Sequence, residues 1–124
     1  MNRQNIIDRL IELQLPQKEY WVLTGAAMVL YGFKEETADI DLGCSKYLAD
    51  ILDAKGYFTE IMDDGKRHIV ISTDVELFEE WIEDVVVNVC QIPVISVSGL
   101  ISIKKKLARK KDLIDIDLIY KHIM

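Results

Sequence analysis

Two short stretches decide the fold of this chain: Leu23-Thr24-Gly25-Ala26-Ala27-Met28 and, after a spacer, Ala38-Asp39-Ile40-Asp41-Leu42. The second stretch alternates apolar and acidic residues. This predicts a strand over 38–42 with both carboxylates on one face, about 7 Å apart along the backbone. Neighbouring carboxylates repel unless a cation lies between them, and hard oxygen ligands suit Mg²⁺ or Mn²⁺. The alternative is a half-buried strand whose acidic face lies in water.

The first stretch indicates a bend from strand into helix. We predict a strand over 20–23, a turn at Thr24-Gly25 and a short apolar helix over 26–31 that ends near Gly32. Glycine lets a backbone approach a phosphate closely, and amides at the start of a helix bind anions. A plain strand-to-helix turn is the alternative for Gly25. Because the turn lies just upstream of the acidic pair, the two together favour one site for metal and phosphate.

A third carboxylate would complete a site for two metal ions. The strand predicted over 67–78 contains Asp74 and Glu76, and the period-two rule places them on one face. Either could be the third acid. A solvated strand edge is the alternative for both, since Asp and Glu are mostly exposed.

The remaining pattern fills in a single domain over residues 1–124. Asp64-Gly65 is typical of a hairpin turn, so strands 57–62 and 67–78 should pair. Ser98 and Asp112 are the predicted caps of two C-terminal helices. The order of elements predicts an α+β (mixed α/β) fold, with flanking helices and a central mixed or antiparallel sheet of about five to six strands. The further predicted segments are helices 3–14, 46–55 and 98–109, strands 85–91 and 93–97, and a last helix with Leu113, Ile116, Tyr120 and Ile123 on one face.

Charge is distributed unevenly along the chain. The net charge is −6, yet six of the fifteen basic residues lie between Lys104 and Lys111, where there is no acid. A globally acidic chain is a poor candidate for non-specific DNA coating, which needs many phosphate contacts. The local basic cluster could still bind one polyphosphate, or it could be a solvated face.

No pattern indicates secretion or membrane insertion. The N-terminus lacks the features of a signal peptide, and polar residues and Pro93 interrupt the uncharged run 85–103. Cys44 and Cys90 show no zinc-binding spacing, and free thiols suit a reducing compartment. We therefore expect a soluble cytoplasmic protein, with a single disulfide as the alternative for the two cysteines.

The segment 23–32 followed by 37–42 resembles the signature of the polymerase-beta-like nucleotidyltransferase superfamily. That signature is a Gly-Gly or Gly-Ser turn, a spacer, and an acid-apolar-acid run. The tail, with Lys104 followed by Arg109-Lys110-Lys111-Asp112, is similar to the closing helices of small bacterial proteins grouped with abortive-infection toxins. The resemblance covers about residues 20–120.

The resemblance implies a nucleotidyltransferase that moves a nucleoside monophosphate from a nucleotide triphosphate to an acceptor hydroxyl. It implies that Asp39 and Asp41 bind both Mg²⁺ (or Mn²⁺) ions. Glu76 aligns best with the third acid, which would bind one metal and help to deprotonate the attacking hydroxyl. The acceptor is open: a protein, an RNA end or a small molecule. The nucleotide-binding residues implied are Thr24, Gly25 and Ala26, with backbone amides near the phosphates, and Lys104 or Lys111 at the triphosphate.

Three departures from the family pattern keep a second class of function open. The turn has no second Gly or Ser, Glu35 stands where an arginine is common, and the third acid is Glu rather than Asp. The alternative is a catalytically impaired module that binds a partner, for example in a toxin–antitoxin pair. A generic α/β domain without a site is a third reading. Because the chain is short for an enzyme that also selects an acceptor, we expect a second copy or a partner protein to complete the acceptor pocket.

Overall fold

The structure is a computed structural model that describes residues 1–81 and 86–123. Within these residues five α-helices and one 3-10 helix flank a seven-stranded mixed sheet with the order β3-β4-β5-β2-β1-β7-β6. The strands are β1 (Tyr20–Leu23), β2 (Ile40–Cys44), β3 (Phe58–Ile61), β4 (Arg67–Ser72), β5 (Val75–Glu79), β6 (Val86–Val89) and β7 (Ile92–Ile95). The helices are α1 (Arg3–Leu13), η1 (Gln17–Glu19), α2 (Thr24–Leu30), α3 (Lys46–Ala54), α4 (Val97–Leu107) and α5 (Lys110–Ile123).

The predicted α+β class is confirmed, and the sheet has one strand more than expected. The stretch 67–78 is two strands, because the chain turns at Thr73-Asp74 and β4 pairs antiparallel with β5. Ser, Thr and Asp favour turns through bonds from their side chains to the nearby backbone. The hairpin at Asp64-Gly65 is confirmed, and Gly65 has the positive φ of 83° that such a turn requires.

Most other predicted elements are present within a few residues. The exceptions include the caps of the last two helices. The N-cap of α4 is Ser96, whose Oγ accepts from the Gly99 amide at 3.1 Å, and not Ser98. Asp112 lies inside the first turn of α5, and its carboxylate accepts from the Arg109 amide at 3.1 Å. Both predicted caps were wrong for one reason: Ser and Asp side chains can accept from the free amides at the start of a helix either at the N-cap or from within the first turn.

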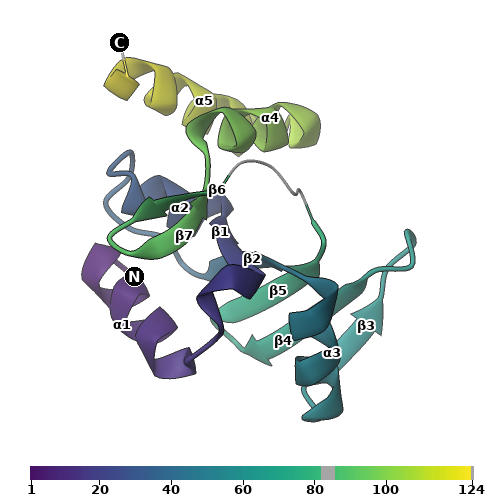
Figure 1. The fold of residues 1–124 in the computed structure, drawn as a ribbon. Helices are drawn as coiled ribbons and strands as arrows, with labels where there is room; N and C mark the ends of the chain where they lie inside the picture. The colour runs from purple at the N-terminus through teal and green to yellow at the C-terminus, as the bar shows by residue number, and fades with distance from the viewer. Residues whose placement is uncertain (82–85, 124) are drawn as a thin grey trace.

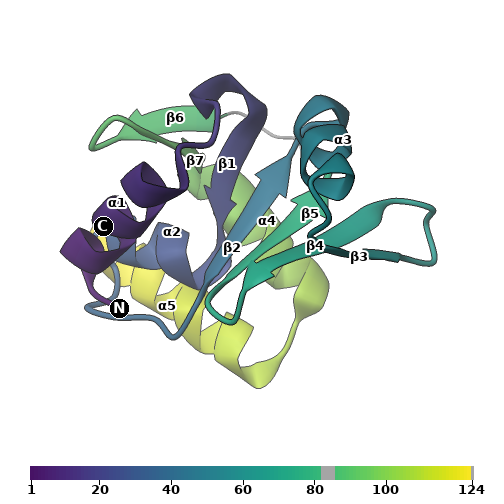
Figure 2. The same ribbon diagram turned by 90° about the horizontal axis from the view of Figure 1, so that it is seen from below.

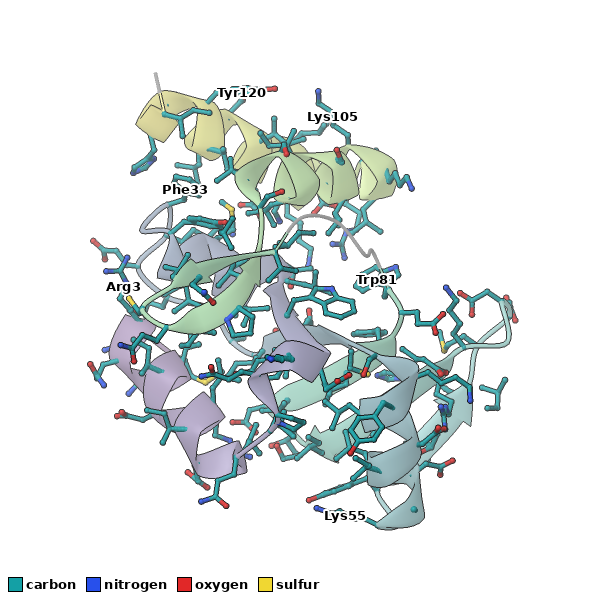
Figure 3. The ribbon with its side chains drawn as sticks, viewed as in Figure 1. Arg3, Phe33, Lys55, Trp81, Lys105 and Tyr120 are labelled. Carbon is teal, nitrogen blue, oxygen red and sulfur yellow. The ribbon has the colours of Figure 1, made fainter. Side chains whose placement is uncertain are left out.

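The buried face of α5 also differs from the predicted one. Of the four predicted side chains only Ile116 is buried; Leu113, Tyr120 and Ile123 are exposed. Tyr120 projects from the outer side of α5 (Figure 3). The buried residues of this helix are Asp112, Asp115, Ile116 and Ile119. The apolar spacing was misleading because two aspartates occupy the inner face.

Of the five α-helices in the described residues, four lie toward the ends of the molecule, and α2 lies between them beside the sheet. Figure 1 shows α4 and α5 side by side at one end and α1 and α3 at the opposite end. Figure 2, a view from below, shows the strands fanning out from β6 to β3. The short helix α2 contacts α1, α4, β1 and β2, and Ala26 to Leu30 are all buried. Burial of α2 fixes the position of the turn at its start, because that turn joins it to β1.

Two further expectations concern the membrane and the cysteines. Among residues 1–81 and 86–123, no helix has the length and apolar character needed to span a bilayer. Both cysteines are free thiols, so the disulfide alternative is wrong; Cys44 is buried and Cys90 is exposed. Burial raises the pKa of the Cys44 thiol to about 12, which keeps it protonated. The start of the predicted strand 85–91 lies outside the described residues, and β6 begins at Val86.

Candidate functional site

The strand register creates two neighbouring rows of side chains on one face of the sheet. Asp41 of β2 lies opposite Glu76 of β5, and two residues further along Gly43 lies opposite Phe78. Gly43 is also paired with Trp21 of β1. Directly paired residues project from the same face, and residues two apart share that face. An acidic row, Asp41 and Glu76, therefore runs beside an aromatic row, Trp21 and Phe78.

Glycine at position 43 makes the aromatic row possible. A Cβ atom there would lie 2.1 Å from Nε1 of Trp21, so the indole occupies the space above the glycine. The same Nε1 donates to the backbone oxygen of Trp81 at 3.2 Å, which brings the end of β5 over β1 and β2. Trp81 packs in turn against Phe78, with ring centroids 4.8 Å apart.

Asp39, Asp41 and Glu76 line one pocket of about 350 Å³, here called the carboxylate pocket. Asp39 does not lie within the strand as predicted, because β2 begins at Ile40. Asp39 is the residue just before the strand, and its position still allows it to line the same pocket. The other lining residues are Thr24, Gly25, Lys34, Thr37, Phe78, Trp81, Lys104, Leu107, Arg109, Lys111 and Asp115.

Thr24 and Gly25, predicted as a turn before the helix, are the first two residues of α2, and they meet the acidic pair directly. Thr24 Oγ1 donates to Oδ2 of Asp41 at 2.9 Å, which fixes the orientation of that carboxylate. Thr24 has φ of 50°, an uncommon backbone conformation for a β-branched residue. Gly25 lies against Thr37, because an added Cβ would be 2.5 Å from Thr37 Oγ1. Ala26 is completely buried and, in the part of the chain described, does not line the pocket.

The pKa of Asp41 reflects both its burial and the charges around it. Burial raises the pKa of Asp41, the Thr24 hydroxyl opposes this, and the charges of Asp39 and Glu76 raise it further. Lys111 lowers it. The pocket offers hard carboxylate oxygens that repel one another, a donor set that fits Mg²⁺. Among the described residues no three His, Cys, Asp or Glu side chains lie close enough together to hold a metal ion by themselves, so an ion bound here would need additional ligands.

Asp74 is separated from the site, contrary to the prediction that it shares a face with Glu76. The turn before β5 carries Asp74 toward α1, where Arg9 Nε donates to its Oδ2 at 3.0 Å. Hydrogen bonds from Arg9 and Ser72 hold the pKa of Asp74 below its usual value. Glu76 lines the carboxylate pocket and Asp74 does not. Of the two candidates for third acid, Glu76 is therefore the one positioned with Asp39 and Asp41.

The two predicted phosphate-binding lysines have different surroundings. Lys104 is 3 % exposed, and its Nζ lies 2.8 Å from Asp115 and 3.7 Å from Asp112. Lys111 is exposed and lines the carboxylate pocket. Its ammonium has no ion-pair partner within residues 1–81 and 86–123. Lys111 is thus available to a ligand, whereas the charge of Lys104 is already compensated.

Sequence reasoning missed several residues that line the carboxylate pocket. Arg109 belongs to a segment recognised as basic, but its proximity to Asp41 depends on the fold; the Asp41 charge helps to raise the pKa of Arg109 after the larger effect of Asp112. Lys34 and Thr37 come from the connection between α2 and β2; Thr37 begins the segment 37–42 that carries the resemblance, but nothing in the sequence assigned either side chain to the pocket. Phe78 could have been found by extending the period-two rule from Glu76 along β5, whereas Trp81 lies beyond the end of that strand and off its period.

Comparison with known proteins supports the fold. No family model matches the sequence, and no curated protein matches it either. Among solved structures, the chain is similar to a candidate nucleotidyltransferase from Thermotoga maritima, with a TM-score of 0.66 and 15% identity. The alignment covers 98% of this chain and 96% of that one. The chain therefore has a nucleotidyltransferase fold, and at this identity the likeness extends to the fold alone.

Proposed function

We propose that this protein is a metal-dependent nucleotidyltransferase whose active site is the carboxylate pocket. The observation that carries the proposal is the convergence of Asp39, Asp41 and Glu76 with the Thr24-Gly25 turn around one cavity, in a fold shared with a candidate nucleotidyltransferase. Basic side chains stand on the other side of the cavity, among them Arg109 and Lys111. Such a pocket offers carboxylates for cations and cations for phosphates.

The residues have separate roles in this proposal. Asp39, Asp41 and Glu76 would hold Mg²⁺, and the Thr24 hydroxyl keeps the Asp41 carboxylate oriented. When bound, the metal supplies neutralisation of the negative charge on the transferring phosphoryl group. Gly25 lines the pocket with only its backbone, since Thr37 fills the space that a side chain would take, and Lys111 attracts the charge of the triphosphate.

The chemistry is an in-line displacement on the α-phosphorus. The acceptor hydroxyl oxygen forms the new bond to phosphorus, and the bond from phosphorus to the bridging oxygen of the β-phosphate breaks. Pyrophosphate leaves, and the hydroxyl proton goes to the Glu76 carboxylate. The protein contributes mainly by orienting groups and balancing charge.

The test is incorporation of label from α-phosphate-labelled nucleotide triphosphates into separate pools of protein, RNA and small hydroxyl compounds, with Mg²⁺. We expect Asp39→Asn and Asp41→Asn to abolish incorporation. Asp74→Asn is the matched control and should retain it, because Asp74 faces α1. Equal activity of the wild type and both Asn variants would exclude this site.

A second candidate, a partner-binding module of the same fold, is favoured by the outer surface of α5. Leu113, Ile114 and Ile123 are each more than half exposed there. Exposed apolar side chains that gather on one element often mark an interface. Calorimetry with MgATP and MgCTP separates the candidates: a chain that binds neither nucleotide, but forms an oligomer lost in Leu113→Lys, is a binding module.

A further inference from the structure

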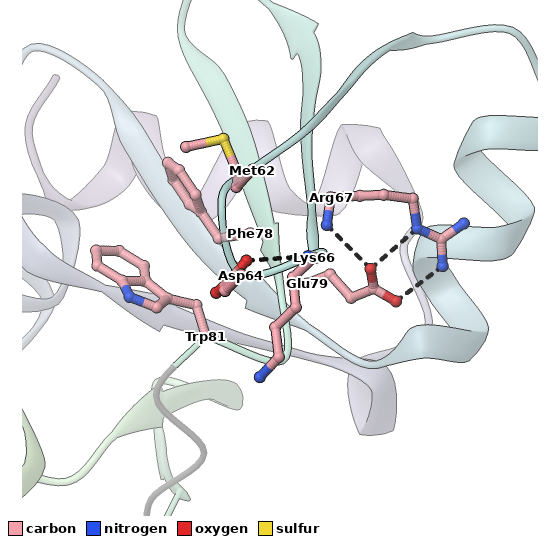
Figure 4. A pocket seen from close by; sticks show the side chains of 7 residues that line it. All are labelled: Met62, Asp64, Lys66, Arg67, Phe78, Glu79 and Trp81. Carbon is pink, nitrogen blue, oxygen red and sulfur yellow. Dashed lines mark hydrogen bonds and ion pairs between the residues drawn. The ribbon is translucent and has the colours of Figure 1, made fainter.

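A second cavity adjoins the carboxylate pocket. It has a volume of about 200 Å³ and lies between the β3–β4 hairpin and the end of β5 (Figure 4). Phe78 and Trp81 line both cavities, so their rings form the common wall. Met62 completes the apolar lining of the second cavity, which is called the aromatic slot below. Any ligand group in the slot would therefore touch rings that also border the acidic row.

The polar groups at one side of the aromatic slot already have partners. Oε1 of Glu79 accepts from Nε of Arg67 at 3.0 Å, and Oε2 accepts from Nη2 at 2.8 Å, as Figure 4 shows. The Arg67 backbone amide donates to the same carboxylate at 3.0 Å. A guanidinium and a carboxylate paired by two hydrogen bonds hold each other in a fixed geometry, so this ion pair requires no hydrogen bonds from a ligand. The contacts left for a ligand are made by the apolar side chains and by the polar mouth of the slot.

The rings of the aromatic slot are held in place from behind. His68 of β4 is the cross-strand neighbour of Phe78, and their rings stack 4.7 Å apart at 11°. Nδ1 of His68 lies 3.1 Å from Oε1 of Glu60, so the imidazole is itself fixed. The ring of Phe78 also packs against Trp81, with centroids 4.8 Å apart. Rings that are fixed before binding give a ligand more net affinity, because little side-chain entropy is lost.

The position of the slot relative to the acids indicates what it binds. Phe78 follows Glu76 by two residues on the same face of β5, so the aromatic wall begins beside the carboxylate pocket. A ligand that fills both cavities has a phosphate in one and a flat apolar group in the other. Asp64 and Lys66 add polar atoms to the lining, with Asp64 Oδ1 accepting from the Lys66 amide at 2.9 Å and the Lys66 ammonium 3.8 Å from Glu80. A nucleobase has this combination of π-faces and a polar edge.

We propose that the aromatic slot is a nucleobase subsite, an inference that rests on the proposed function. The base can belong to the donor nucleotide or to the end of an oligonucleotide acceptor, and both present the same stacking faces. Stacking of a base on an aromatic side chain strengthens binding roughly 5- to 150-fold. The proposal therefore predicts a measurable gain in affinity that depends on the slot residues.

The experiment is calorimetry with Mg²⁺ and three probes: inorganic tripolyphosphate, ATP and a short single-stranded RNA. Met62→Ala changes the slot only, since Met62 lines the slot and does not line the carboxylate pocket. Trp81→Ala removes the shared ring, and Trp81→Phe keeps a ring. Ile61→Ala is the matched control, because Ile61 is 67% exposed and does not line the slot. Met62 is 42% exposed, so its variant should fold.

We expect ATP to bind the wild type more tightly than tripolyphosphate by the factor above. Met62→Ala and Trp81→Ala should reduce this advantage several-fold, whereas Trp81→Phe and Ile61→Ala retain it, and Met62→Ala leaves tripolyphosphate affinity unchanged. If only RNA affinity depends on Met62 and Trp81, the base belongs to the acceptor. If neither ATP nor RNA affinity depends on them, the inference is overturned. A wild type that binds neither tripolyphosphate nor ATP instead overturns the proposed function.

Discussion

Replacing Lys104 with Met separates a structural role of this lysine from a role in phosphate binding. Lys104 is buried between α4 and α5, where its ammonium contacts Asp115 at 2.8 Å and Asp112 at 3.7 Å. The variant leaves two buried carboxylates with one cation fewer. Removing one member of a buried ion pair costs about 3–5 kcal/mol, because the remaining charge is left without compensation in a poor solvent.

Two other contacts place the expected loss at the lower end of that range. Lys34 lies 2.6 Å from Asp115, and Arg109 lies 2.6 Å from Asp112, so neither acid becomes isolated. We therefore expect Lys104→Met to lower the free energy of unfolding by about 3 kcal/mol. For a domain of this size the melting temperature should fall by roughly 10–15 °C.

The assay is thermal and urea unfolding followed by circular dichroism. Lys105→Met is the matched control: Lys105 projects outward from α4 (Figure 3), and the same substitution there should change stability by less than about 0.5 kcal/mol. Lys104→Met combined with Asp115→Leu should recover part of the loss, because the uncompensated carboxylate is gone. If Lys104→Met has the melting temperature of the wild type but binds tripolyphosphate more weakly, the structural role of Lys104 is refuted.

Three further predictions concern other parts of the molecule. Gly43→Ala should displace the indole of Trp21, which is 8% exposed, and lower the free energy of unfolding by about 3 kcal/mol or more. The expected readouts are a red shift in tryptophan emission and a lower urea midpoint, and an unchanged emission spectrum would contradict the prediction. The folded state raises the pKa of Asp41, so the ionised carboxylate opposes folding above that pKa, and in the presence of a chelator the wild type should become more stable as the pH falls from neutral toward 3.8, the ordinary value. Asp41→Asn should be more stable than the wild type at pH 7 and should not become more stable over this pH range. Melting curves between neutral pH and 3.8 test both expectations. The pKa of Asp74 is lowered, so its effect on stability has the opposite pH dependence: the Arg9–Asp74 ion pair stabilises the fold at neutral pH and this stabilisation is lost as the pH falls below 3.8. Arg9→Met should therefore lower the free energy of unfolding at neutral pH by about 1 kcal/mol. Altered nucleotide affinity in this variant would be evidence against the separation of Asp74 from the site.

The features that the sequence predicted well are those set by neighbouring residues. Alternation around Asp41, the Asp64-Gly65 turn and the apolar spacing of α1 depend on local backbone geometry, which a short stretch determines. Glu76 was predicted to join Asp41 because a third acid would complete a two-metal site and because of the family resemblance; the cross-strand register of β2 and β5 places the two residues side by side.

The features that it could not predict depend on contacts between distant segments. Asp74 and Glu76 looked equivalent because nothing near them reveals that Arg9, far away in the chain, pairs with Asp74. Lys104 looked available to a ligand because its partners lie on the next helix. The face of α5 was misassigned for the same reason, since Asp112 and Asp115 are buried only because Arg109, Lys104 and Lys34 neutralise them.

Under the proposed function, the charges around the carboxylate pocket explain why acidic and basic residues are distributed unevenly along the chain. The sheet side supplies Asp41 and Glu76, and the helical side supplies Arg109 and Lys111. A metal–triphosphate complex has the complementary order, with cations at the reacting phosphate and negative oxygens beyond it. Free triphosphate should be repelled by the acidic row and bound only with Mg²⁺, because the metal reverses the sign of the group that meets the carboxylates. The basic cluster within an acidic chain therefore fits the recognition of one polyphosphate better than the coating of a nucleic acid.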